Sequence, residues 1–280
     1  MEQIAESARS KRLSLWVGAG ISNDPPASLP LANELKFHIL ERICDSPDLR
    51  QLYEARLQEG KEIGNRIKHY PLEAFVELVL RNYAPNIVEK IAEVFRSGEP
   101  NGNHITIAKA IRNGFIRNVL TTNFDLLIEK ALYYLGWTKG KDFEVYFTED
   151  HFSRMDRNPS LPCVFKIHGS ANDESSIKVT LNLVASEMLS RNRLKALEHF
   201  LGAQETHDIL VIGYGVGDEF DINPVVSKIR SESRIFYIDH RLGNQSIGGL
   251  PRVFSGFKGD TLVCDARMII RHLERSLLLG

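Results

Sequence analysis

The stretch that decides the fold is Leu13-Ser14-Leu15-Trp16-Val17-Gly18-Ala19-Gly20-Ile21-Ser22. Its first five residues are mostly apolar and rich in strand-forming side chains, so we expect a buried β-strand over residues 13–17. Gly18 and Gly20 follow directly. Glycines here let the backbone turn tightly and bring its amides to a pyrophosphate without interference from a Cβ atom. Alone, the segment fits a plain strand-to-loop turn equally well, because Asn23 stands where a third glycine is usual and no Lys-Ser/Thr pair of a Walker P-loop follows.

Two further segments follow apolar, strand-like runs in the same way. Thr121-Thr122-Asn123-Phe124-Asp125 comes after a strand predicted over residues 115–120, and His168-Gly169 comes after the apolar run 164–167. The carboxyl ends of parallel strands meet at one edge of a sheet, and open α/β sheets bind ligands at that edge. The sequence therefore predicts that all three segments line one dinucleotide pocket.

Each of these segments also has a purely structural interpretation. Thr122 or Asn123 could cap the helix expected over residues 124–135, and Asp125 could interact favourably with the dipole of that helix. A single histidine at a strand end is more often a satisfied core residue than a catalytic one. As a neutral imidazole near physiological pH, however, His168 could accept a proton from a ribose hydroxyl, which makes it a chemically suitable general base.

Considered together, these motifs resemble those of the sirtuin family, and specifically of its zinc-free branch of bacterial sirtuin-like NAD hydrolases, the anti-phage defence type. Residues 18–22 match the phosphate loop of the family. Residues 122–125 match its Gln-Asn-Ile-Asp motif, with Thr122 in place of the glutamine, and His168-Gly169 matches its catalytic His-Gly pair. The resemblance covers most of the chain.

The resemblance implies roles for particular residues, with NAD as the substrate. As catalytic residues, Asn123 would hold the water or ribose at the anomeric carbon, Asp125 would contact the nicotinamide carboxamide, and His168 would act as the base. Residues 209–215 resemble a later strand and glycine loop of the family, and Asp239 ends a last apolar strand near where the family holds the adenosine ribose. The binding residues implied in this way are Gly18, Ala19, Gly20, Ser22, Asn23, Thr122, Gly213, Tyr214, Gly215 and Asp239.

Cysteine usage separates this chain from the sirtuin deacylases. Those enzymes carry a four-cysteine zinc ribbon beside the peptide groove, and structural zinc needs four ligands at close spacing. This chain has only Cys44, Cys163 and Cys264, with no Cys-x-x-Cys pair. We therefore predict no zinc or other metal site, and a reaction in which water is the acceptor.

Three functions remain open at this point. The leading one is an NAD hydrolase, or NAD glycohydrolase, that releases nicotinamide and ADP-ribose or cyclic ADP-ribose as an effector of bacterial defence. The alternative is an NAD-dependent protein deacylase with an unusual peptide site. The second alternative is a non-catalytic sensor of NAD or ADP-ribose.

The spacing of apolar residues predicts an α/β fold, namely a Rossmann-like, doubly wound, mainly parallel sheet of about six strands without a zinc ribbon. Helical patterns dominate residues 31–112, so we expect a helical module inserted within a single NAD-binding domain of residues 1–280. Because this module directly follows the glycine loop, we expect it to border the ligand cleft and to control access to it.

Composition bounds the partners and the compartment. The chain has 35 basic and 36 acidic residues among 280, which leaves no overall field that favours nucleic acid or an anionic membrane. We interpret the basic cluster Arg191-Asn192-Arg193 as a solvated helix face. The absence of a signal peptide and of a membrane-length apolar run, together with three scattered cysteines, predicts a cytoplasmic protein. We also expect a homo-oligomer and a sensor or regulatory protein as partner.

Overall fold

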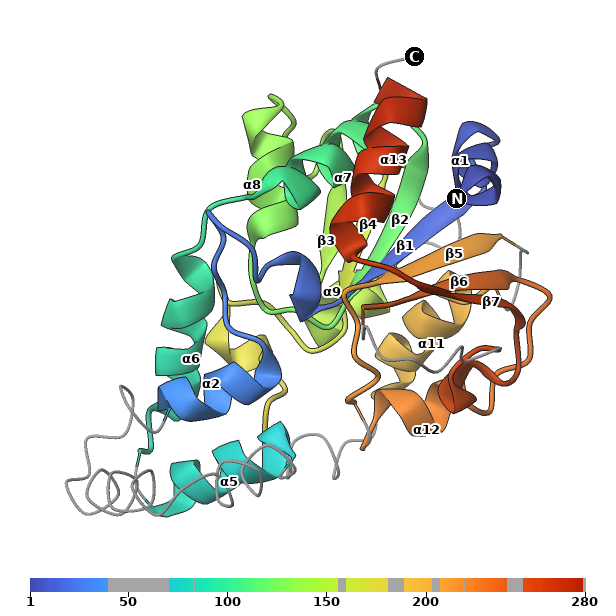
Figure 1. Cartoon of the computed structure of the whole chain (residues 1–280). Coiled ribbons are helices and arrows are strands. Elements are labelled where there is room, and N and C mark those ends of the chain that lie inside the picture. The colour runs from blue at the N-terminus through green and yellow to red at the C-terminus, as the bar shows by residue number, and fades with distance from the viewer. Residues whose placement is uncertain are drawn as a thin grey trace.

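The computed structural model describes residues 1–39, 71–82, 84–155, 160–180, 189–202, 207–218, 220–240 and 249–278. At its centre lies a seven-stranded sheet in which every pairing between neighbouring strands is parallel (Figure 1). In sheet order the strands are β3 (Glu144–Tyr146), β4 (Cys163–Lys166), β2 (Ile116–Thr121), β1 (Leu13–Val17), β5 (Asp208–Ile212), β6 (Arg234–Asp239) and β7 (Lys258–Val263). The predicted doubly wound α/β fold is confirmed, with seven strands rather than about six.

Helices cover both faces of the sheet. The strands that follow β1 in the chain are added first on one side of β1 and then on its other side. One face carries α1 (Glu2–Arg9), α7 (Gly102–Arg112), α8 (Leu127–Tyr134) and α13 (Ala266–Leu278). The other carries α9 (Glu149–Ser153), α11 (Arg191–Phe200) and α12 (Ile222–Val226). From β1 the chain proceeds to β2 on one side, and after β4 it returns to the other side of β1 to form β5. The carboxyl ends of β1 and β5 therefore form a topological switch point, where open α/β sheets bind ligands.

A third group of helices has an apolar core of its own. It consists of α2 (Ala32–His38), α5 (Leu72–Asn82) and α6 (Ile87–Arg96), which lie apart from the helices that cover the sheet (Figure 1). Their buried side chains pack against Phe124 and Leu127, which follow β2. This helical group therefore packs on the turn that the sequence assigns to the ligand pocket.

We propose that this group is the inserted module, and that the module ends before α7 rather than at residue 112. The buried side chains of α7, such as Ile107 and Ile111, pack in the core shared by the sheet, α1, α8 and α13. Residues 40–70, which contain part of the predicted helical pattern, lie outside the described residues. Within the part of the chain that the structure describes, no helix is long and apolar enough to cross a membrane.

The register of the strands aligns the predicted segments at the carboxyl edge. Val17 lies beside Thr121 on one side and beside Ile212 on the other, and Thr121 lies beside Lys166. The residues that follow β1, β2, β4 and β5 therefore start from one level of the sheet. The glycine loop, the turn at residues 122–125 and His168 consequently occupy the same edge.

Candidate active site

Two glycine loops meet where β1 and β5 end. The amide of Gly18 donates to the Ile212 carbonyl at 3.0 Å, and that of Gly20 donates to the Gly213 carbonyl at 2.9 Å. A Cβ atom at Gly18 would lie 2.5 Å from the Gly213 carbonyl oxygen, and one at Gly20 would lie 2.9 Å from the Gly213 Cα atom. No side chain fits at these distances, so both glycines are required for the contact between the loops themselves.

Most backbone amides of the first glycine loop donate to carbonyls of the protein itself. Besides Gly18 and Gly20, Ile21 and Ser22 donate their amides to carbonyls within the loop. Each of these four amides has a protein acceptor in this structure, and their contact with a pyrophosphate stays a prediction. Of the amides in residues 18–22, only that of Ala19 has no acceptor among the described residues.

We expect the substitution Gly18→Ala to lower the thermal unfolding midpoint, at a cost of about 1–3 kcal/mol, because the added methyl group forces the two loops apart. Gly102→Ala is the matched control, since a Cβ atom at Gly102 would meet nothing within 4 Å. Equal midpoints for the two variants would show that the loops tolerate the methyl group.

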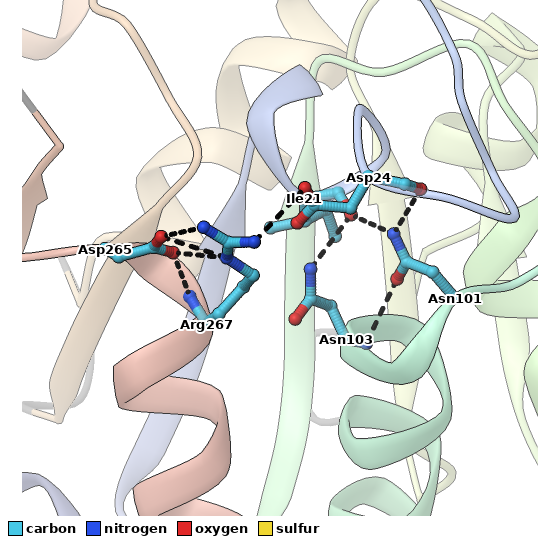
Figure 2. Close-up of polar contacts among 6 residues, drawn as sticks. All are labelled: Ile21, Asp24, Asn101, Asn103, Asp265 and Arg267. Carbon is cyan, nitrogen blue, oxygen red and sulfur yellow. Dashed lines mark hydrogen bonds and ion pairs between the residues drawn. The ribbon is translucent and has the colours of Figure 1, made fainter.

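The loop beyond Ile21 is held by the beginnings of two helices (Figure 2). Asn101, the cap of α7, donates to the carbonyls of Ile21 and Asp24 at 2.9 and 3.1 Å, and Asn103 donates to that of Ile21 at 3.2 Å. At the start of α13, the Arg267 guanidinium lies 3.8 Å from the Asp24 carboxylate. Protein contacts alone thus fix the path of this loop.

Ser22 joins two buried side chains from other elements. Its hydroxyl donates to the Asp125 carboxylate at 2.9 Å and lies 3.1 Å from Nε2 of His104 on α7. Nδ1 of His104 accepts from the Asn101 amide at 3.2 Å, so the neutral ring carries its proton on Nε2 and donates it to Ser22. Burial lowers the pKa of His104 to about 4, despite the opposing charge of Asp125. His104 therefore cannot activate Ser22 as a nucleophile, and the three side chains instead fix one another.

Asp125 lies just before the start of α8, where the structural interpretation expects it to interact with the helix dipole. A carboxylate oxygen of Asp125 accepts from the Leu127 amide at 3.0 Å. The Asn123 amide donates to the Thr121 hydroxyl, also at 3.0 Å. The side chains of Thr122 and Asn123 are half-buried and have no hydrogen-bond partner among the described residues. They are therefore available to a ligand at this edge.

A buried lysine fixes the turn that carries Asp125. The ammonium group of Lys166, near the end of β4, lies 3.0 Å from the Glu129 carboxylate of α8. It also donates to the carbonyl of Phe124, at 3.3 Å, and to that of Asp125. All three ammonium donors are thus satisfied, as a buried charge requires. The family motifs miss Lys166, although a lysine within an apolar strand is a visible signal.

His168 lies between two carboxylates from the loop after β5. Its Nε2 atom is 3.0 Å from Oδ2 of Asp221, and its Nδ1 atom is 3.8 Å from Oδ1 of Asp218. Burial disfavours the charged ring, but Asp221 and Asp218, with a smaller contribution from Glu73 of α5, outweigh it and raise the pKa of His168 to about 9. The expectation of a neutral imidazole at physiological pH is therefore wrong for this conformation.

The two aspartates differ in their own ionisation. Burial alone would raise the pKa of Asp221, but the charge of His168 and the hydrogen bonds that Asp221 accepts lower it. Burial raises the pKa of Asp218, and His168 offsets this only in part. Asp221 is therefore the firmly ionised partner of His168, whereas Asp218 takes up a proton more readily.

The remaining predicted binding residues lie at the carboxyl edge with differing exposure. Tyr214 is buried against Trp16, with ring centroids 4.8 Å apart, whereas Gly215 is exposed. Asp239 is buried at the end of β6. The side-chain amide of Asn23 donates to a carbonyl of its own loop at 3.1 Å, so it supports the loop.

The basic cluster at residues 191–193 is not wholly a solvated face. Arg193 is buried and donates to the carbonyl of Ile167 and, at 3.1 Å, to that of Phe147. The interpretation is wrong for this residue because buried carbonyls beyond β3 and β4 need donors. Since Ile167 immediately precedes His168, Arg193 holds the backbone from which that histidine extends.

Metal ligands are not grouped in the described residues. There, no cluster of three or more His, Cys, Asp or Glu side chains is arranged to hold a metal ion. Cys163 is buried in β4 and Cys264 is half-buried after β7, while Cys44 lies outside the described residues.

The two buried histidines should give opposite dependences of stability on pH. Unfolded histidine titrates near pH 6.5, while folded His104 does so near 4 and folded His168 near 9. Between pH 6.5 and 4 this histidine binds a proton in the unfolded chain but stays neutral in the folded protein. His104 therefore lowers the free energy of unfolding as the pH falls. Below pH 6.5 the stability due to protonated His168 is fully present, and it is lost as the pH rises through 9.

Unfolding midpoints measured from pH 4 to 9.5 for the native protein, His104→Gln and His168→Gln would check this. We expect His104→Gln to weaken the acid loss of stability and His168→Gln to weaken the alkaline loss. An advantage of the native protein over His168→Gln that grows from pH 6.5 to 9 would contradict the sign.

Comparison with known protein families assigns the sequence between β2 and β6. Residues 117–238 match the family model of the SIR2-like domain, and this range contains Asn123, His168 and Asp221. The predicted resemblance to sirtuins is thereby confirmed. Defense-associated sirtuin 2 of Bacillus subtilis is 26% identical over an alignment of 239 residues, and the match covers 82% of this chain and 20% of that protein. The chain thus spans about a fifth of the length of this curated relative.

Solved structures of Sir2 proteins are similar at lower identity. One, described as a structural basis for the mechanism and regulation of Sir2 enzymes, is 13% identical with a TM-score of 0.45, and the match covers 99% of this chain and 98% of that one. A Sir2 homolog–NAD complex is 14% identical, also with a TM-score of 0.45, and the match covers 99% and 95% of the two chains. The site described above rests on contacts within this chain.

Proposed function

We propose that this protein is an NAD glycohydrolase that cleaves the nicotinamide–ribose bond and releases nicotinamide with ADP-ribose or cyclic ADP-ribose. One observation carries the proposal. Asn123, Asp125 and His168 follow adjacent strands at the sheet edge where two glycine loops meet, within the range of the SIR2-like domain. Recognition of phosphate and adenosine alone would not require this trio.

The geometry supports distinct roles for the three residues. Cleavage of the bond places positive charge on the ribosyl carbon, and the half-buried side chain of Asn123 would orient the attacking water. Asp125, whose carboxylate is fixed by Ser22 and the Leu127 amide, would hold the nicotinamide carboxamide. His168 would accept the proton of a ribose hydroxyl or of the water once its ring is neutral.

One observation favours a second candidate, a sensor of NAD or ADP-ribose without turnover. Both ring nitrogens of His168 face carboxylates, and the charged ring cannot act as a base. The sensor and the hydrolase share the same pocket and differ only in whether His168 loses its proton.

We further propose an effector role in bacterial defence, in the cytoplasm, with a regulatory protein partner and self-association of the chain. The name of the Bacillus subtilis relative supports the defence role. The activating signal would then act on access to the pocket, through the α2, α5 and α6 group that packs on Phe124.

Product analysis tests these functions together. Purified protein is incubated with NAD, with and without candidate partner proteins, and with an acylated peptide in a parallel reaction. Release of nicotinamide with ADP-ribose or its cyclic form, without need of the peptide, supports the hydrolase. An acylated ribose formed only with peptide would establish the deacylase, and NAD binding without nicotinamide release under every condition would establish the sensor.

A further inference from the structure

The two aspartates beside His168 are held in different ways. One carboxylate oxygen of Asp221 bonds to Nε2 of His168 at 3.0 Å, and the other accepts from the Ile222 amide at 2.7 Å as the cap of α12. Asp221 is therefore fixed at both oxygens. Asp218 lies 3.8 Å from Nδ1, beyond hydrogen-bond distance, so its contact with the ring is an ion pair without a hydrogen bond.

We propose that Asp221 is the positioning residue of His168. Asp218 lies on the opposite, Nδ1 side of the ring, which a ribose hydroxyl must reach, and accepts the Nδ1 proton. This inference deepens the proposed function and rests on it for the identity of the substrate. Neither aspartate belongs to the three motifs that indicate the sirtuin resemblance.

The two aspartates have different roles because the ring must lose its Nδ1 proton before it can act as a base. For the ring to become a base, Asp218 first moves to within hydrogen-bond distance of Nδ1. The Nδ1–H bond then breaks and the proton passes to a carboxylate oxygen of Asp218, which becomes a neutral acid. The ring keeps its Nε2 proton in the hydrogen bond to Asp221, so its orientation and tautomer are retained. The lone pair exposed on Nδ1 then accepts the proton of the ribose hydroxyl.

The surroundings of the ring favour this route. Burial raises the pKa of Asp218, which makes it the better proton acceptor of the pair. The other titratable groups near the cluster are Glu73 of α5 and the hydroxyl of Tyr214, and burial raises the pKa of both. Glu73 adds to the attraction that keeps the ring charged, so the helical module contributes to holding His168 in its protonated form.

The pKa of His168, measured by NMR on the full chain with labelled histidine, tests the geometry without turnover. His168→Gln assigns the signal. We expect Asp221→Asn and Asp218→Asn each to lower this pKa by at least about one unit, the usual effect of removing a nearby opposite charge. Asp260→Asn, an exposed site in β7, is the charge-matched control and should leave it unchanged. Saturating ADP-ribose should lower the pKa in the native protein but not in Asp218→Asn.

The pH profile of nicotinamide release separates the two aspartates. In Asp218→Asn the rising limb of kcat/KM should move to lower pH, because the ring loses its proton more readily without the attraction of that carboxylate. In Asp221→Asn the limb should also move, but the plateau of kcat should fall at least about tenfold because the ring is no longer oriented. A full plateau in Asp221→Asn would overturn its positioning role. A pKa that ADP-ribose leaves unchanged would overturn the role of Asp218. A native protein that binds NAD but never releases nicotinamide would reject the proposed function alone, since the NMR titration does not depend on it.

Discussion

Replacing His168 with glutamine should lower the rate of nicotinamide release at least about a hundredfold, the usual scale for the loss of a general base. Glutamine can still donate a hydrogen bond to Asp221, but it cannot take up a proton. The side chains that bond or pair with this ring are those of Asp221 and Asp218 rather than the glycine loops, so binding of NAD should persist. Initial rates and calorimetric binding of NAD, measured on the same preparation, separate the two effects.

Two variants bracket this result. Asn123→Ala should give a comparable loss, because misplacing the nucleophile by about an ångström costs roughly a hundredfold. His207→Gln is the matched control, since that ring contacts the Phe200 carbonyl at the amino end of β5, away from the ligand edge. A His168→Gln protein that keeps more than about a tenth of the native rate would reject the base role.

The second large effect is expected from Lys166→Met, which removes the cation and leaves the Glu129 carboxylate buried. Breaking one half of a buried ion pair costs about 3–5 kcal/mol, because the remaining charge has lost its partner. The side chain of Lys166 is 0% exposed and that of Glu129 is 8% exposed, so solvent offers little relief. We expect a fall in the thermal unfolding midpoint on the order of 10 °C.

A double variant separates the effect of the unpaired Glu129 charge from the effect of the hydrogen bonds that the turn loses. Lys166→Met with Glu129→Leu removes both charges and should recover most of the lost stability. It cannot restore the donors to the Phe124 and Asp125 carbonyls, so nicotinamide release should stay low while the midpoint recovers. Recovery of both would show that Lys166 serves stability alone, and recovery of neither would show that the pair is not the source of the loss.

The framework of the site could be predicted because it depends on local patterns. Apolar runs bounded by glycine and polar turns predict the strands, and the geometry of a parallel sheet then fixes where their carboxyl ends lie. Asn123, Asp125 and His168 therefore reach one edge without knowledge of any tertiary contact. The two edge strands differ from the others, since β3 has only three residues and β7 is partly exposed.

The charges at the site could not be predicted, because they depend on contacts between distant segments. Asp221 and His168 are 53 residues apart, and Lys166 and Glu129 are 37 apart. Asp218 and Asp221 do follow a strand and a glycine loop, so the positional rule that singled out His168 applies to them as well. Helix α8 begins at Leu127 rather than at Phe124, because Phe124 is buried in the core of the helical module and the Asp125 carboxylate accepts a hydrogen bond from the Leu127 amide.

The contact between the two glycine loops affects how substitutions at Gly18 and Gly20 combine, and therefore how the sequence of these loops can evolve. Gly18 and Gly20 both abut Gly213, so the first added methyl group already separates the loops. A second methyl group then causes less further strain. The loss in the free energy of unfolding for Gly18→Ala with Gly20→Ala should therefore be smaller than the sum of the two single losses. The two sites are thus energetically coupled, and a lineage or a designer that has lost one of these glycines has less to lose from the other.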